Sequence, residues 1–350
     1  MTAQSSFLTG VVEGFYGRPW THAMRVSYAG YLARLGLNSY LYCPKADPYL
    51  RKQWQLDWPD TEWAQLLELA GVYRTKNVLF GVGLSPFALY KDYNAESRAQ
   101  LKAKIQKLNS LNAPLLAILF DDMPGDVSDL AARQADIVAD VKAWSNAGRL
   151  LVCPTYYSDD PVLETHFGQM PEGYWQRLGE ALDSDIDLFW TGPQVCSEAI
   201  SSDDLTDISG ALGRGVVLWD NYPVNDGAKR SNHLYCQPLA RREPNASELR
   251  GHFCNPMNQA LLSLPALMGL SELYQGSVEP GLLETVLGED TWSLLSRDRA
   301  DFEALGLSGI GASSCADLAK SYDVLPGEAA QEVAGWLRGE YTFDPACLTD

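Results

Sequence analysis

Histidine, basic residues and long apolar runs are scarce in this chain. Its 350 residues include 27 lysines and arginines against 45 aspartates and glutamates, which gives a net charge of −18. A charge of that sign disfavours nucleic acid, anionic membrane surfaces and polyanionic polymers as partners. The four histidines have no metal-ligand spacing, so we expect neither a metal-dependent hydrolase nor a cofactor. They are His22, His166, His233 and His252.

The sequence also lacks the features of membrane insertion, secretion and cross-linking. No apolar run approaches the roughly 18 residues of a membrane helix. Residues 1–9 have neither the basic start nor the apolar stretch of a signal peptide. The seven cysteines are odd in number, scattered and without zinc or redox spacing. We therefore expect a reducing compartment, the cytoplasm.

Eight short apolar runs recur along most of the chain, about one strand-plus-helix unit apart. Segments with helical periodicity lie between them, for example Tyr28, Tyr31, Leu32 and Leu35 on one face. This alternation predicts an α/β fold, a (β/α)8 TIM-type barrel. The runs begin at Leu8, Ser39, Val78, Leu115, Leu150, Asp187, Val216 and His252.

An open doubly wound sheet is the rival architecture. It would be expected to carry a glycine-rich phosphate turn after its first strand, and Gly14-Phe15-Tyr16-Gly17 does not have the required spacing. Beyond about residue 258 the pattern changes to short helices, predicted at 282–295, 298–305 and 328–337. We expect a catalytic barrel over residues 1–275 and a small helical region over 276–350.

Two carboxylates follow the fourth run. Leu115–Phe120 reads as a strand buried on both faces, and Asp121 and Asp122 come directly after it. An Asp-rich turn is the structural alternative. Paired acids at the mouth of a buried strand are also what a hydrolase places beside a scissile bond.

Polar and aromatic residues follow most of the other predicted strands. Active sites of this fold lie where the strands end, and rings with Asn, Asp and Lys suit a carbohydrate. Taken singly, Lys45 could be solvated, Trp219 could be core, Asp220 could fix a loop and Asn255 could form a turn. Those readings do not explain why such residues occur together at most strand ends.

Long motifs in this order resemble glycoside hydrolase family 84, the β-N-acetylglucosaminidases that include protein O-GlcNAcases. The resemblance runs from about residue 8 to 260. The motifs are Gly10–Trp20, Tyr40–Lys45, Phe120–Asp122, Cys153–Tyr157, Trp190–Val195, Trp219–Asn221 and Asn225-Asp226.

The resemblance implies a retaining exo-β-N-acetylglucosaminidase in which the sugar's acetamido oxygen is the nucleophile and an oxazoline is the intermediate. Asp121 would accept the acetamido N–H, and Asp122 would be the general acid and base. We expect the neighbouring carboxylate to raise the pKa of Asp122. Because side chains alternate along a strand, both acids reach one pocket only if the backbone bends there, and Met123-Pro124-Gly125 suits a bend.

The resemblance also implies roles in sugar binding. Gly14, through its backbone, and Lys45 would contact hydroxyls, Tyr157 would stabilise the oxazoline, and Asn221 would brace Asp121. The remaining candidates are Asp226 and Asn255 for the far hydroxyls, Tyr16 and Trp219 as walls, and Cys153 and Val195 nearby. Two departures from the family pattern are Ala46-Asp47-Pro48 after Lys45 and Tyr156 where relatives can carry an acid.

The expected partner is a terminal β-N-acetylglucosamine on a protein or glycan, and the helical region could be a dimerisation surface. Two alternatives remain open. A hyaluronidase-like endo activity is disfavoured by the acidic charge. A catalytically inactive sugar-binding protein is disfavoured by the presence of both aspartates. The natural aglycone is not specified by the sequence.

Overall fold

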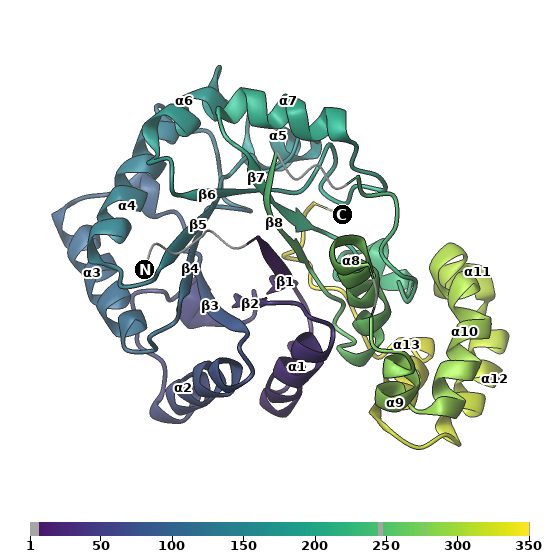
Figure 1. Cartoon of the computed structure of the whole chain (residues 1–350). Coiled ribbons are helices and arrows are strands. Elements are labelled where there is room, and N and C mark those ends of the chain that lie inside the picture. Colours follow the sequence, from purple (N-terminus) through teal and green to yellow (C-terminus); the bar gives the residue numbers. More distant parts are fainter. Residues whose placement is uncertain (1–6, 244–247, 277, 350) are drawn as a thin grey trace.

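Eight parallel strands close into a barrel in the computed structural model, which describes residues 7–243, 248–276 and 278–349. Each strand pairs with its neighbours in chain order, and the first pairs with the eighth, as Figure 1 shows. The predicted (β/α)8 barrel is therefore confirmed. The strands are β1 (Leu8–Glu13), β2 (Ser39–Tyr42), β3 (Leu79–Leu84), β4 (Leu115–Leu119), β5 (Arg149–Cys153), β6 (Asp187–Trp190), β7 (Val216–Asp220) and β8 (Leu249–Cys254).

Helices surround the barrel because the strands are almost wholly buried, so their outer faces need a cover. The eighth strand begins three residues before the predicted run, because Leu249 and Gly251 also pair with β7 across an irregular register. The covering helices are α1 (His22–Arg34), α2 (Asp60–Thr75), α3 (Ala95–Asn109), α4 (Leu130–Trp144), α5 (Val162–Phe167), α6 (Tyr174–Ala181), α7 (Ser202–Leu212) and α8 (Leu264–Gln275).

The described residues beyond the barrel form five further helices, which pack beside it (Figure 1). The predicted break after Leu295 is wrong: the helix instead begins after Gly288, whose φ of 89° suits glycine and ends the preceding helix. A helix over 312–323 was not predicted, whereas the last one has the predicted bounds. They are α9 (Leu282–Leu287), α10 (Glu289–Ala304), α11 (Gly306–Ile310), α12 (Ala312–Asp323) and α13 (Glu328–Leu337).

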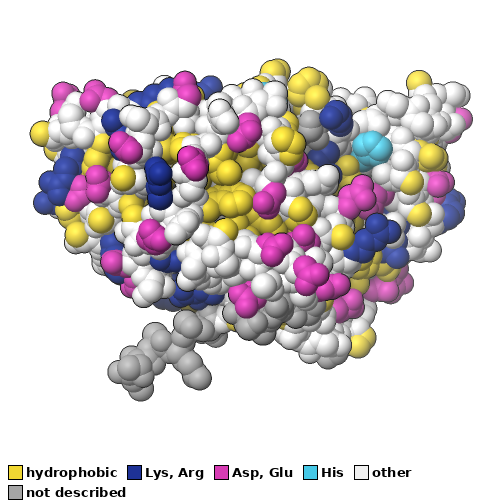
Figure 2. All heavy atoms as spheres, turned by 90° about the horizontal axis from the view of Figure 1, so that it is seen from above, with side chains coloured by type: hydrophobic (Ala, Val, Ile, Leu, Met, Phe, Trp, Pro, Cys, Tyr) yellow, Lys and Arg dark blue, Asp and Glu magenta, His cyan; other side chains and the backbone are white. Residues whose placement is uncertain are grey.

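Acidic and basic side chains are mixed on the surface. Figure 2 shows Asp and Glu side chains interspersed with Lys and Arg over the face seen from above. Within the described residues, no helix combines the length and the apolar character needed to cross a bilayer. All seven cysteines lie in the described part, and none of them forms a disulfide.

Candidate active site

The chain turns sharply where β4 ends. Phe120 still donates its backbone N–H to the Cys153 carbonyl at 2.8 Å, in the direction of the sheet. Asp122 then adopts a φ of 54°, the left-handed conformation, which is uncommon outside glycine but tolerated by aspartate. The bend that the paired acids require is present, at Asp122 itself. Both carboxylates consequently line one cavity.

This cavity measures about 500 Å³, part of it open to solvent, at the carboxyl ends of the strands. The structure brings all twelve candidate residues to its walls, although they come from seven different strand ends. They are Gly14, Tyr16, Lys45, Asp121, Asp122, Cys153, Tyr157, Val195, Trp219, Asn221, Asp226 and Asn255. Cys347 and Thr349, from the far end of the chain, also line it.

Asp122 is held by two phenols. Tyr16 donates its hydroxyl to Oδ2 at 2.6 Å, and Tyr157 donates its hydroxyl to Oδ1 at 2.9 Å. Burial alone would raise the pKa of Asp122, but the charges of Lys45 and Arg51 and the two phenolic hydrogen bonds outweigh it and hold the pKa below its usual value. The expected rise in the pKa of Asp122 is therefore wrong for this arrangement, because cations outnumber the single neighbouring carboxylate.

Arg51 was missed by the sequence reasoning. It is 6% exposed, follows the short 3-10 turn η1 (Pro48–Leu50) and donates to the Asp122 carbonyl at 3.1 Å and to Ser85 Oγ at 2.9 Å. Arg51 thus holds the carbonyl of Asp122 in the orientation that the left-handed backbone conformation of this residue gives it. Eight residues separate Arg51 from the end of β2, so no strand-end pattern points to it.

Asp121 has one engaged and one unengaged oxygen. Its Oδ2 bonds the Lys45 ammonium, which also lies 3.8 Å from Asp122 Oδ2. Its Oδ1 is buried and has no hydrogen-bond partner among the described residues. Such a group costs free energy unless a ligand donor satisfies it. Lys45 is buried between the two acids, so its reading as a solvated lysine is excluded.

A chain of hydrogen bonds connects the opposite wall. Asn221 Oδ1 accepts from Trp219 Nε1 at 3.1 Å and from Asn255 Nδ2 at 2.9 Å, and its own amide donates to the Val195 carbonyl at 2.8 Å. The polar contacts of Asn221 therefore go to this wall, and it is Lys45 that contacts Asp121. Asn255 also accepts from the Gly14 N–H at 3.2 Å.

Gly14 permits the indole of Trp219 to lie against the backbone. A Cβ at this position would fall 2.2 Å from Trp219 Cζ2, closer than any side chain could tolerate. Trp219 is thus both a buried core residue, packed edge-on against Phe189, and a wall of the cavity.

Asp226 is a third acid in the cavity. Its Oδ2 accepts the Tyr16 backbone N–H at 2.7 Å. Burial raises the pKa of Asp226 to about 6. Near neutral pH it is therefore an ionised acceptor that a sugar hydroxyl could satisfy.

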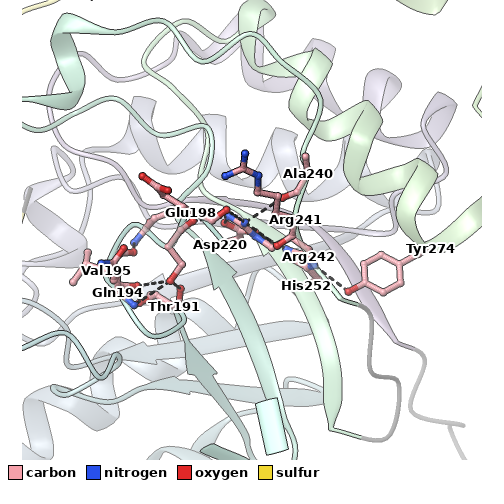
Figure 3. Close-up of polar contacts among 12 residues, drawn as sticks. Thr191, Gln194, Val195, Glu198, Asp220, Ala240, Arg241, Arg242, His252 and Tyr274 are labelled. Atoms are coloured by element: carbon pink, nitrogen blue, oxygen red, sulfur yellow. Dashed lines mark hydrogen bonds and ion pairs between the residues drawn. The ribbon is translucent and has the colours of Figure 1, made fainter. Parts of the chain in front are cut away.

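Asp220 is structural. Arg242 donates to both its oxygens, at 2.6 and 2.9 Å, and His252 Nε2 lies 3.1 Å from Oδ2 (Figure 3). Arg242 also donates to the Ser197 and Glu198 carbonyls. The loop reading of Asp220 was correct: the pair ties the β6–α7 connection to β7 and β8.

The two departures from the family pattern are also structural. Asp47 accepts from Tyr42 and Trp58 and caps η1, and Tyr156 donates to the Gly168 carbonyl at 2.6 Å. Neither lines the cavity. Over the described residues, no group of three or more His, Cys, Asp or Glu could hold a metal ion.

An acid pair at the strand ends of a barrel, in a cavity walled by aromatic and amide groups, defines a glycoside hydrolase site. Residues 9–280 match the family model described as beta-N-acetylglucosaminidase. The chain belongs to this family, the beta-N-acetylglucosaminidases of glycoside hydrolase family 84.

Individual relatives agree with that placement. The chain is 29% identical over 300 residues to the protein O-GlcNAcases of Mus musculus and Rattus norvegicus. That match covers 83% of the chain but only 32% of either relative, so it spans about a third of their length. A mutant O-GlcNAc hydrolase of Thermobaculum terrenum superposes with a TM-score of 0.77 at 25% identity, covering 96% of this chain and 82% of that one.

Proposed function

We propose that this chain is a retaining exo-β-N-acetylglucosaminidase that uses the acetamido group of its substrate as the nucleophile and removes O-GlcNAc from proteins. The observation that supports this most is the unengaged, buried Oδ1 of Asp121 beside Asp122. A carboxylate oxygen in that position is suited to an N–H donor such as the 2-acetamido group.

In the first step, Asp121 accepts the acetamido N–H while the acetamido oxygen attacks the anomeric carbon. The bond to the aglycone oxygen breaks, and Asp122 gives that oxygen its proton. The intermediate is an oxazoline, whose nitrogen has given its proton to Asp121. In the second step a water attacks the anomeric carbon and Asp122 takes its proton. The oxazoline ring opens, Asp121 returns the proton to the nitrogen, and N-acetylglucosamine leaves with retained configuration.

The lowered pKa of Asp122 fits the second step, where it must be a base, better than the first. The two phenols, Lys45 and Arg51 all stabilise its ionised form. Displacement of any of these contacts by substrate would raise the pKa of Asp122 towards that of an acid.

Leaving-group dependence tests the assignment. Asp122→Asn should lose orders of magnitude in rate on alkyl glycosides and much less on aryl glycosides with acidic phenols, because good leaving groups need little protonation. Asp121→Asn should slow both classes alike. Equal losses for Asp122→Asn on activated and unactivated glycosides would contradict its role as the acid.

The nucleophile is tested separately with fluorinated N-acyl substrates. If the acyl oxygen attacks, the rate should fall steeply with each added fluorine, because fluorine withdraws electron density from that oxygen. A rate indifferent to fluorine would indicate a protein nucleophile, for which Asp226 is the remaining acid in the cavity.

We also propose that the protein works in the cytoplasm and that its substrate carries a terminal β-N-acetylglucosamine on a protein or glycan. Comparison of a glycoprotein with a free glycoside, in wild type and Asp122→Asn, tests the substrate. A dimer through α9–α13 stays a prediction that light scattering would check.

A further inference from the structure

The chain returns to the cavity after α13. We call residues 338–349 the return segment. In Figure 1 it is the yellow trace that leaves α13 and passes behind the barrel towards the C-terminal label. Two of its residues, Cys347 and Thr349, line the cavity that holds Asp121 and Asp122.

These two residues contact groups that the proposed function assigns to the sugar. The Cys347 thiol lies 3.8 Å from Asp226 Oδ1, the carboxylate proposed to hold ring hydroxyls. The Thr349 side chain lies close to the hydroxyl of Tyr157, which donates to Asp122 Oδ1 at 2.9 Å. The return segment therefore engages the hydroxyl-binding and the reacting side of the site together.

A local turn presents these side chains to the cavity. Asp344 Oδ1 accepts the Ala346 N–H, and its carbonyl accepts the Cys347 N–H, both at 2.9 Å. Further back, the Arg18 guanidinium lies 5.2 Å from the Tyr341 ring centre, which holds the start of the segment.

The part of the return segment beyond Tyr341 buries few apolar side chains. Its two large apolar side chains, Phe343 and Leu348, are 43% and 49% exposed, so they bury little apolar area. Little burial means a small free energy of release. A segment that is largely exposed and contacts the ligand-binding groups is one that a ligand can displace.

We propose that the return segment is an intramolecular ligand of the sugar cavity, which competes with the N-acetylglucosamine unit of the substrate. This rests on the proposed function of the site. The segment is tethered, so even weak contacts act at a millimolar effective concentration. Only the fraction of molecules with the segment released binds substrate, and the apparent KM rises by the inverse of that fraction.

The test compares the full chain with a chain that ends at Thr342, which keeps Tyr341 and its contact with Arg18. Removal of residues 343–350 should lower KM for an aryl N-acetyl-β-glucosaminide by about threefold or more. It should leave kcat within about twofold, because the groups that react are unchanged. The double variant Cys347→Ala/Thr349→Val should also lower KM, but by a smaller factor. Leu348→Ala, between them and exposed, is the matched control and should behave as wild type.

A synthetic peptide of residues 343–350 supplies an independent readout. Added to the shortened chain, it should inhibit competitively at millimolar concentration. Equal KM values for the full and shortened chains, both active, would overturn the proposal while leaving the proposed function intact. Two forms that neither hydrolyse the glycoside nor bind N-acetylglucosamine would overturn the proposed function and this inference with it.

Discussion

Asp122 combines a backbone conformation and an electrostatic setting that ordinary strand-end aspartates lack. Its left-handed φ turns the second acid toward the same cavity as the first. The same turn exposes its carbonyl to Arg51 and its carboxylate to two phenols. At this residue, conformation and charge are therefore set together.

Asp226 should make substrate affinity depend on pH. Its pKa of about 6 means that it loses its charge as the pH falls through that value. We expect KM to be constant near neutrality and to rise several-fold towards about pH 5, since a neutral carboxyl is a weaker acceptor for hydroxyls. Asp226→Asn should have a raised KM with no such dependence. A wild-type KM that stays flat across this range would contradict the assignment.

At the scale of the element, the connection between β2 and α2 supports an acid that belongs to β4. Arg51 reaches from it to the Asp122 carbonyl and to Ser85, just beyond β3. Three strand ends are thereby joined without any contact between Arg51 and the reacting atoms.

Arg51→Gln should lower kcat by roughly 10- to 100-fold through misplacement of Asp122. Loss of the positive charge should also raise the pKa of Asp122, so the basic limb of kcat/KM should move to higher pH. The pH profile separates this from a merely structural loss, which would lower kcat and leave the limb in place. Lys52→Gln, the exposed neighbour, is the control for charge.

The buried pair of Asp220 and Arg242 should matter for stability instead. Arg242→Met leaves a buried carboxylate without its main partner and should cost about 3–5 kcal/mol in urea unfolding. The double variant Asp220→Asn/Arg242→Met should recover part of that loss. If Arg242→Met has the same free energy of unfolding as wild type, the ion pair does not stabilise the fold.

Much of the architecture was predictable because parallel barrel strands are buried on both faces and so appear as apolar runs. Seven of the eight begin within one residue of the predicted start, and the polar residues after them converge because all strands end on one side. Arg51, the lowered pKa of Asp122 and the return segment were not predictable. Each depends on contacts between segments far apart in the sequence, which leave no periodic pattern.

At the scale of the whole molecule, the interface between the helical region and the barrel contains a buried acid, Glu332. Glu332 of α13 accepts the backbone N–H groups of Leu261 and Leu262 at 3.3 and 3.1 Å, just before α8. Burial raises the pKa of Glu332 from 4.5 to about 8. Attachment of the helices to the barrel is therefore linked to proton binding at this residue.

Stability should accordingly fall in mildly alkaline solution. Because the folded-state pKa is raised, the contribution of Glu332 is complete below 4.5 and is lost as the pH rises through about 8. We expect Tm to drop by a few degrees between neutral pH and about pH 9, and Glu332→Gln to remove most of that drop. Glu284→Gln, an exposed site on α9, should retain it. An identical slope in both variants would rule out Glu332 as the source.

The missing side chain at position 14 limits how this enzyme can be redesigned. Since the indole of Trp219 fills the space that a Cβ would need, any larger residue at position 14 must push that ring into the cavity. Attempts to admit a bulkier sugar should therefore keep Gly14 and replace Trp219 of β7 by a smaller residue.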